Sequence, residues 1–198
     1  MKSFTLALAF VLALAFSGSA LAAKKHDDKD NAVFIKGGIG GYTGGLGDST
    51  TAGPVWGVAL NLQPTNVIGF ELSYDGSRNE LRDGRLAADN TPNALRNGAS
   101  AMLKLGLPFI ERIKPFVGAG LGASYVAITG DSGGLYRNDI MEEVPLAAGV
   151  EFNSGVFTAG FRAGYRVLVD EGFADPATNG GDPSGGLLDL AATIGGRF

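Results

Sequence analysis

One serine in this sequence lies in a pentapeptide of catalytic appearance. The segment GDSGG, residues 130–134, has the form found around the nucleophile of one large class of serine proteases, which would make Ser132 that nucleophile. Such chemistry needs a histidine as general base and an aspartate that orients it. The chain has one histidine, His26, in a charged stretch near the N-terminus. We therefore interpret residues 130–134 as part of a loop.

A glycine-rich segment has the spacing of a dinucleotide-binding fingerprint. GAGLGA, residues 118–123, fits the pattern G-x-G-x-x-A. In that fingerprint a helix follows the glycines, and its N-terminus holds the pyrophosphate of the cofactor. Here the segment continues into SYVAI, which extends the pattern of a strand. We interpret its glycines as positions of close packing within a strand, and we expect neither a cofactor nor a metal.

Single charged residues recur in segments that otherwise carry apolar or small side chains. They include both signs: Lys36, Glu71, Lys104, Glu151, Arg162, Arg166, Asp189 and Arg197. A buried charge is very unfavourable unless an opposite charge and hydrogen bonds compensate it. If the fold gathers these residues in its interior, it must therefore pair them with one another. Whether they meet depends on the elements that carry them.

Eight segments alternate apolar residues with small or polar residues at the period of a β-strand. They lie near residues 32–42, 55–63, 67–75, 99–107, 115–127, 144–152, 156–167 and 188–198. In the clearest one, VFTAGFRAGYRV, Phe157, Phe161 and Tyr165 share one face, while Arg162 and Arg166 share the other with glycines. The same alternation places the charged residues above on the faces with small side chains. Each strand therefore has one apolar face and one face of small side chains on which single charges occur.

The first 31 residues differ in composition from the rest of the chain. Residues 1–22 combine Lys2, an apolar run and the small-residue exit Ala20-Leu21-Ala22, which together are typical of a secretory signal peptide. The apolar run is shorter than the ~20 residues of a membrane-spanning helix. Residues 23–31 form a short charged tail, and residues 32–198 form the remaining domain.

Charge and cysteine content limit the class of protein. A net charge of −4 and a pI near 5.0 offer no basic surface for nucleic acid. The chain contains no cysteine, so disulfide bonds cannot stabilise it after export. Its stability must come from packing or from a sheet that closes on itself.

The connections between the predicted strands alternate in length. Those after the second, fourth and sixth strands are short, whereas the others span residues 43–53, 76–97, 129–140 and 170–185. Short turns at one rim and long loops at the other are typical of bacterial outer-membrane barrels. A soluble β-sandwich is the alternative, but its polar faces would meet water, whereas these faces are mainly small residues with single charges. We therefore predict an all-β fold, an eight-stranded antiparallel up-and-down transmembrane β-barrel, with both termini on the periplasmic side.

Six segments, in their order and spacing, resemble the OmpA-like superfamily of eight-stranded outer-membrane β-barrels: FIKGGIGGY, GFELSY, KPFVGAGLGASY, PLAAGVEF, GFRAGYRV and ATIGGRF. The resemblance implies a location in the outer membrane of a Gram-negative bacterium. It also implies that Phe198, a terminal aromatic residue after alternating apolar positions, is the signal read by the barrel-assembly machinery. Enzymes among such barrels use a histidine near the extracellular rim, so we expect no catalytic activity here.

The resemblance also implies a role for the inward charges. In the best-studied OmpA-type barrel, an acid on the third strand, a lysine on the fourth, an acid on the sixth and an arginine on the seventh form a cluster described as a gate. Glu71, Lys104, Glu151 and Arg162 lie on the matching strands, and Arg166 follows on the seventh. Because side chains can fill an eight-stranded barrel, we expect these residues to form a paired network inside a filled lumen. A small gated pore for ions or small solutes is the alternative.

The long loops are the remaining candidates for function, since loops on a rigid scaffold commonly carry it. The second carries mixed charge and the fourth is acidic, with Arg78, Glu80, Arg82, Asp83, Arg85, Asp89 and Arg96 in the former and Asp170, Glu171, Asp175 and Asp182 in the latter. We expect a monomeric, non-enzymatic protein with a structural or surface-interaction role. Its expected partners are outer-membrane lipid, lipopolysaccharide and, during assembly, the barrel-assembly machinery. An adhesin that acts through these loops is a further alternative.

Overall fold

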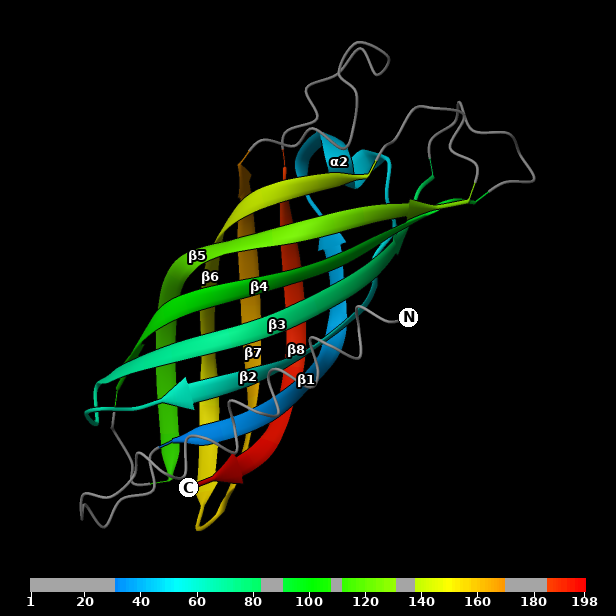
Figure 1. The fold of residues 1–198 in the computed structure, drawn as a ribbon. Helices are drawn as coiled ribbons and strands as arrows, with labels where there is room; N and C mark the ends of the chain where they lie inside the picture. The colour runs from blue at the N-terminus through cyan, green and yellow to red at the C-terminus, as the bar shows by residue number, and fades with distance from the viewer. Residues whose placement is uncertain (1–30, 83–90, 108–111, 131–137, 170–184) are drawn as a thin grey trace.

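The computed structural model is an antiparallel sheet that closes on itself as a barrel (Figure 1). The structure describes residues 31–82, 91–107, 112–130, 138–169 and 185–198. Within them, eight strands follow in chain order: β1 (Ala32–Tyr42), β2 (Gly53–Leu62), β3 (Ile68–Glu80), β4 (Asn93–Gly106), β5 (Ile113–Thr129), β6 (Asp139–Ser154), β7 (Phe157–Val169) and β8 (Gly186–Arg197). A short helix, α2 (Gly44–Asp48), lies between β1 and β2. The closed sheet confirms the predicted fold class and rules out the two-sheet sandwich.

The first and last strands close the barrel by pairing along their whole length. The register runs from Ala32 opposite Arg197 to Tyr42 opposite Leu187. Beyond β8, the backbone N–H of Phe198 donates a hydrogen bond to the carbonyl oxygen of Asn31 at 2.9 Å. Closure pairs the edge groups that a membrane interior could not satisfy. The start of β1 and the end of β8 lie at the same rim, which we call the short-turn rim.

The strands alternate as predicted, so the barrel has an apolar outer face. In β7, every second residue from Phe157 onward is exposed, and the residues between them are buried. The outward face of β8 exposes Leu188, Leu190 and Ile194 by 47%, 59% and 61%. Large apolar side chains in such a continuous belt fit contact with lipid and not with water. Within the described residues, no helix is long and apolar enough to cross a membrane.

Three strands extend five or six residues beyond a predicted end. The loop expected over residues 76–97 is shorter, because β3 continues to Glu80 and β4 begins at Asn93. Likewise, β6 begins at Asp139 and not at Val144. These extensions carry polar residues, and polar residues between strands are normally a sign of a loop. Their inward side chains find partners inside the barrel, which the sequence pattern alone does not show.

Two buried apolar clusters lie inside the described part of the barrel. The first is near the short-turn rim and consists of Ala32, Phe34 and Ala59. The second is at the opposite, long-loop rim and consists of Tyr42, Leu46, Leu81, Ala94, Val126, Met141, Leu168 and Leu187. Charged side chains occupy the lumen between the two clusters.

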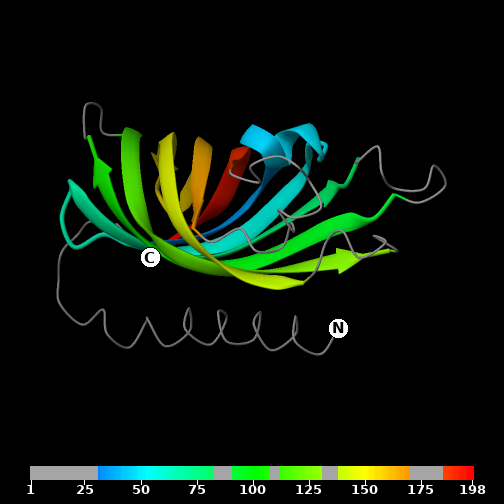
Figure 2. The same ribbon diagram turned by 90° about the horizontal axis from the view of Figure 1, so that it is seen from above.

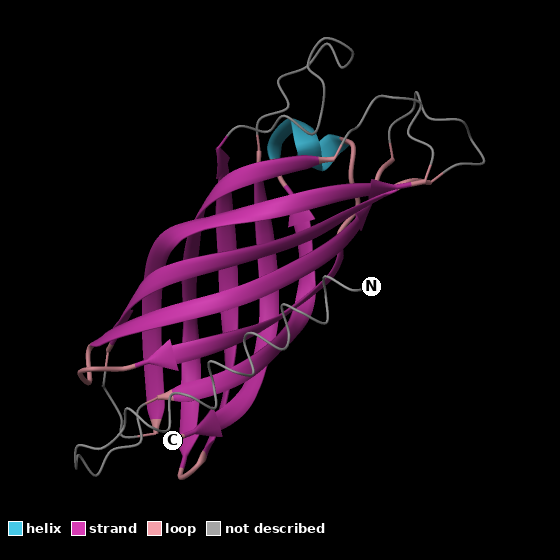
Figure 3. Ribbon diagram, in the orientation of Figure 1, coloured by secondary structure: helices cyan, strands magenta, loops and turns pink. Residues whose placement is uncertain are grey.

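The connections alternate in length as predicted. Residues 63–67, 107–112 and 155–156 join strands at the short-turn rim, and the longer connections lie at the other rim, where Figure 3 shows α2. Figure 2 shows the curvature of the sheet from above. GAGLGA lies within β5, as expected of a strand segment. Ser132, His26, the signal peptide, most of the tail and the acidic fourth loop lie outside the described residues.

Candidate functional site

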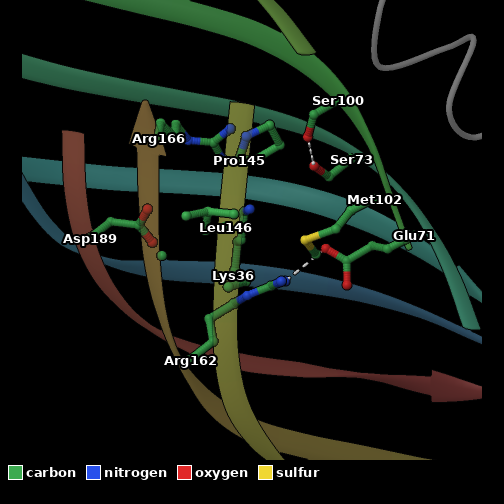
Figure 4. A pocket seen from close by; sticks show the side chains of 12 residues that line it. Lys36, Glu71, Ser73, Ser100, Met102, Pro145, Leu146, Arg162, Arg166 and Asp189 are labelled. Carbon is green, nitrogen blue, oxygen red and sulfur yellow. Dashed lines mark hydrogen bonds and ion pairs between the residues drawn. The ribbon is translucent and has the colours of Figure 1, made fainter. Parts of the chain in front are cut away.

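Four of the predicted charged residues meet in the lumen, and we call them the inner tier. Glu71 of β3 accepts a hydrogen bond from Arg162 of β7, with 2.9 Å between Nη1 and Oε1. The Nζ atom of Lys104 on β4 lies 3.4 Å from the other carboxylate oxygen of Glu71 and 2.5 Å from Oε1 of Glu151 on β6. The tier is therefore a chain of alternating charges that crosses the barrel, with Glu71 between two cations (Figure 4 shows Arg162 and Glu71).

Two inward aromatic rings hold the cations of the inner tier. The Nζ atom of Lys104 lies 4.3 Å from the ring centroid of Phe116 and 5.8 Å from that of Phe34. The guanidinium carbon of Arg162 lies 5.4 Å and 6.0 Å from the same two centroids. A cation near an aromatic face is stabilised by the charge distribution of the ring. Phe34 and Phe116 therefore fix the cations as well as filling space.

A second group of charges, the outer tier, lies nearer the long-loop rim. Arg166 of β7 donates to Glu143 of β6 at 3.3 Å and to Asp75 of β3 at 2.6 Å. Arg96 of β4 forms a bidentate ion pair with Glu143, and Lys36 of β1 forms an ion pair with Asp75. Every one of these five side chains is nearly or fully buried. The outer tier thus links five strands across the lumen.

Arg166 belongs to the outer tier, although the sequence grouped it with the residues of the inner tier. Arg96 was expected in the second loop, but it lies on β4 with 1% of its surface exposed. Glu143 was missed because the sixth strand was predicted to begin one residue later. Parity along the strands could have revealed both, since Arg96 shares the face of Lys104 and Glu143 shares the face of Glu151. Two further residues that were predicted to lie in the second loop, Arg78 and Glu80, belong to a strand as well. They lie on β3, where they are exposed.

Small cavities lie between these side chains in the lumen. One cavity, which both tiers line, has a volume of about 20 Å³, and two others have volumes of about 10 Å³. A cavity of this size holds about one water molecule. The wall of the cavity of about 20 Å³ includes Lys36, Glu71, Arg162, Arg166 and Asp189 (Figure 4). Buried side chains of both tiers therefore project into the described barrel interior.

The remaining predicted inward charges also lie on inner faces. Asp189 is 8% exposed and borders the cavity beside Arg166. Arg197 lines a small cavity at the short-turn rim, and its guanidinium donates to the carbonyl oxygen of Gly155 at 3.3 Å. Phe198, the predicted assembly signal, is 38% exposed beyond the end of β8. Among the described residues, no group of three or more histidine, aspartate or glutamate side chains could hold a metal ion.

Comparison with known proteins gives the same architecture. A model of the family described as "Outer membrane protein beta-barrel domain" matches residues 8–191. No curated protein matches the sequence. Neisserial surface protein A (NspA) is similar in structure, with a TM-score of 0.59 and 16% identity, over 85% of this chain and 97% of that one. Ail, the attachment invasion locus protein of Yersinia pestis, was solved in complex with the heparin analogue sucrose octasulfate. It gives a TM-score of 0.53 and 12% identity, over 85% and 99% of the two chains.

Proposed function

Because the chain belongs to the family of outer-membrane protein β-barrel domains, we propose that it is a non-enzymatic integral protein of the outer membrane whose lumen is closed by its own side chains. Its role is structural or one of surface interaction. The observation that carries this proposal is the pair of ion-paired tiers that cross the lumen. Catalysis has no support in the described lumen, where the charges of the two tiers pair with one another.

The physical argument for a closed lumen rests on size and charge. Eight strands enclose an interior that side chains can just fill. The inner tier has two cations and two anions, so it presents no net charge that would attract an ion into the barrel. Passage of a solute would require breaking buried ion pairs, and an unpaired buried charge is strongly unfavourable.

Conductance in planar lipid bilayers tests this proposal. The purified, folded barrel should give no steady single-channel conductance, while a porin with a wide channel, measured in the same bilayers, provides the positive control. Steady unitary steps from the wild-type protein would overturn the closed-lumen proposal. Such steps would favour the second candidate below.

A small gated pore is the second candidate, and one contact favours it. Lys104 reaches both Glu71 and Glu151, so its ammonium group has two alternative partners in the inner tier. If a channel opens by exchange between these partners, the conductance should change in the variants Glu71→Ala and Arg162→Ala. A bilayer that stays silent with all three proteins would rule this candidate out.

Surface interaction would involve the long-loop rim and the outer-membrane lipid around the belt, including lipopolysaccharide. Ail was solved with a sulfated heparin analogue, but the net charge of −4 of this chain does not favour a polyanionic ligand. An adhesin role predicts that cell or matrix binding is lost when the connection over residues 81–92 is shortened. Unchanged binding by the shortened protein, or no binding by the wild type, would exclude the adhesin role and leave a structural role.

We further propose that the barrel is a monomer with periplasmic termini.

A further inference from the structure

A layer of buried apolar side chains lies at the long-loop end of the lumen. The layer contains eight residues, which are 0–7% exposed and come from α2, from six strands and from the position directly after β3: Tyr42, Leu46, Leu81, Ala94, Val126, Met141, Leu168 and Leu187. Lumens of outer-membrane barrels are normally polar. A nearly complete apolar layer across the lumen therefore calls for an explanation other than strand formation.

This layer lies directly above the outer tier. On each of five strands, the inward residue two positions nearer the barrel centre is polar or charged: Ala94 precedes Arg96, Val126 follows Ser124, Met141 precedes Glu143, Leu168 follows Arg166, and Leu187 precedes Asp189. Two residues along a strand correspond to about 7 Å. The lumen thus changes from charged to apolar within a single step toward the long-loop rim.

The connection between β1 and β2, residues 43–52, completes the layer from above. Its helix α2 places Leu46 in the apolar cluster, where the side chain is 3% exposed. An apolar residue at this depth excludes water from the centre of the mouth. Figure 1 shows α2 at the long-loop rim. We call residues 43–52 the stopper.

Hydrogen bonds fix the stopper to strands on both sides of it. The N–H of Thr43 donates to the carbonyl oxygen of Gly186 on β8 at 2.8 Å, and that of Thr51 donates to Glu80 on β3 at 2.9 Å. The side-chain amide of Asn79 donates to the carbonyl oxygens of Gly40 and Thr51, both at 3.0 Å. These bonds hold the stopper between β8 and β3, so it is a fixed part of the described barrel.

Close approach of the backbone adds a steric requirement. A Cβ atom at Gly185, just before β8, would lie 2.1 Å from the carbonyl oxygen of Thr43. No residue with a side chain fits there without displacing the stopper. A glycine just before β8 is therefore required for residues 43–52 to lie where they do.

We propose that the stopper closes the outer mouth of the lumen independently of the ion-paired tiers. An apolar constriction blocks water and ions because hydrating it is unfavourable, whereas the tiers block them by filling and pairing. The barrel then has two different barriers in series. The inference rests on the proposed closed lumen, but it concerns the outer mouth and has its own readout.

A single introduced thiol tests the stopper directly, because the chain has no cysteine of its own. Ser77 on β3 is fully buried opposite Arg96, just beneath the apolar layer, and its hydroxyl makes no hydrogen bond in the described structure. In the folded Ser77→Cys protein, the thiol should resist a water-soluble methanethiosulfonate reagent. Adding Leu46→Asp should speed modification about tenfold or more. The buried leucine stabilises the closed position of the stopper by removing apolar surface from water, and an aspartate at this position loses that stabilisation.

Two further variants make the outcome decisive. Leu46→Ala keeps the apolar character but shortens the side chain, so it should increase the modification rate less than Leu46→Asp does. It replaces Leu46→Asp in the test if the aspartate variant does not fold. Leu107→Asp changes a leucine that is 45% exposed at the opposite rim and should leave the rate unchanged. Rapid modification with Leu46 in place, or equal rates in all proteins, would overturn the stopper. Failure of the closed-lumen proposal is seen separately, as conductance of the wild-type barrel.

Discussion

At the scale of single residues, the lumen depends on groups that have two roles at once. Glu71 is the clearest example, because its carboxylate oxygens face Arg162 and Lys104 at 2.9 and 3.4 Å. Its loss would leave Arg162 buried without its carboxylate partner and Lys104 with Glu151 alone. The same residue therefore decides both the filling of the lumen and its electrostatic balance.

Replacing this carboxylate should destabilise the barrel strongly. We expect Glu71→Ala to lower the free energy of unfolding by about 3–5 kcal/mol, the usual effect of breaking a buried ion pair. Urea unfolding in lipid vesicles, followed by the gel shift between folded and unfolded barrel, measures it. Glu80→Ala is the matched control, because the exposed pair of Glu80 with Arg82 should contribute about 0–1 kcal/mol. Equal unfolding midpoints for the two variants would contradict the buried role of Glu71.

Close packing around the inner tier predicts a second effect at a single residue. A Cβ atom at Gly149 would lie 2.4 Å from the carbonyl oxygen of Phe161 and 2.8 Å from the ring of Phe116. Gly149→Ala should therefore destabilise the barrel by about 1–3 kcal/mol through overpacking. Gly37→Ala is the control, because nothing lies within 4 Å of the position that its added Cβ atom would take. The same unfolding measurement compares them, and a smaller effect at Gly149 than at Gly37 would refute this packing argument.

At the scale of elements, the sequence predicted the strands well where their two faces differ most. β1 was predicted with its observed bounds, and β7 and β8 within two residues, because their alternation is regular. The extensions of β3, β4 and β6 were missed, since their inward polar residues resemble a loop until their partners on other strands are known. Strand parity placed the charged residues on the inner faces, and the family resemblance grouped the four residues of the inner tier, but parity alone could not separate the two tiers. Nor could it show that α2 places Leu46 inside the barrel.

The end of β8 provides a prediction about assembly. Phe198 follows the last strand residue, and its backbone pairs with Asn31 at the start of the closing seam. Deleting Phe198 should reduce the amount of folded barrel in the outer membrane, because both the closing hydrogen bond and the proposed recognition signal are lost. Phe198→Tyr retains an aromatic ring and should assemble normally. Membrane fractionation with the heat-dependent gel shift measures both, and undiminished assembly of the shortened chain would count against the signal.

At the scale of the whole molecule, the tiers and the stopper form barriers in series. A barrel with Leu46→Asp alone, or with Glu71→Ala and Arg162→Ala alone, should remain silent in planar bilayers, because one barrier still blocks the lumen. To open the outer tier as well, Asp75 and Arg166 are also replaced by alanine, and the protein that combines these four alanine substitutions with Leu46→Asp should show steady conductance. Conductance of the same protein with Leu46 in place would mean that the stopper does not block ions. Each protein is first checked for the folded form by its gel mobility.

The pairing of β1 with β8 also determines when the molecule can become complete. These are the first and last strands of the chain, so the ring can close only after every other strand has been placed. Contacts between such distant segments make folding slow. Until that final step, both β1 and β8 present unpaired edges to which another chain could add. The time before closure is therefore the period in which this protein most needs protection from its neighbours in the cell envelope.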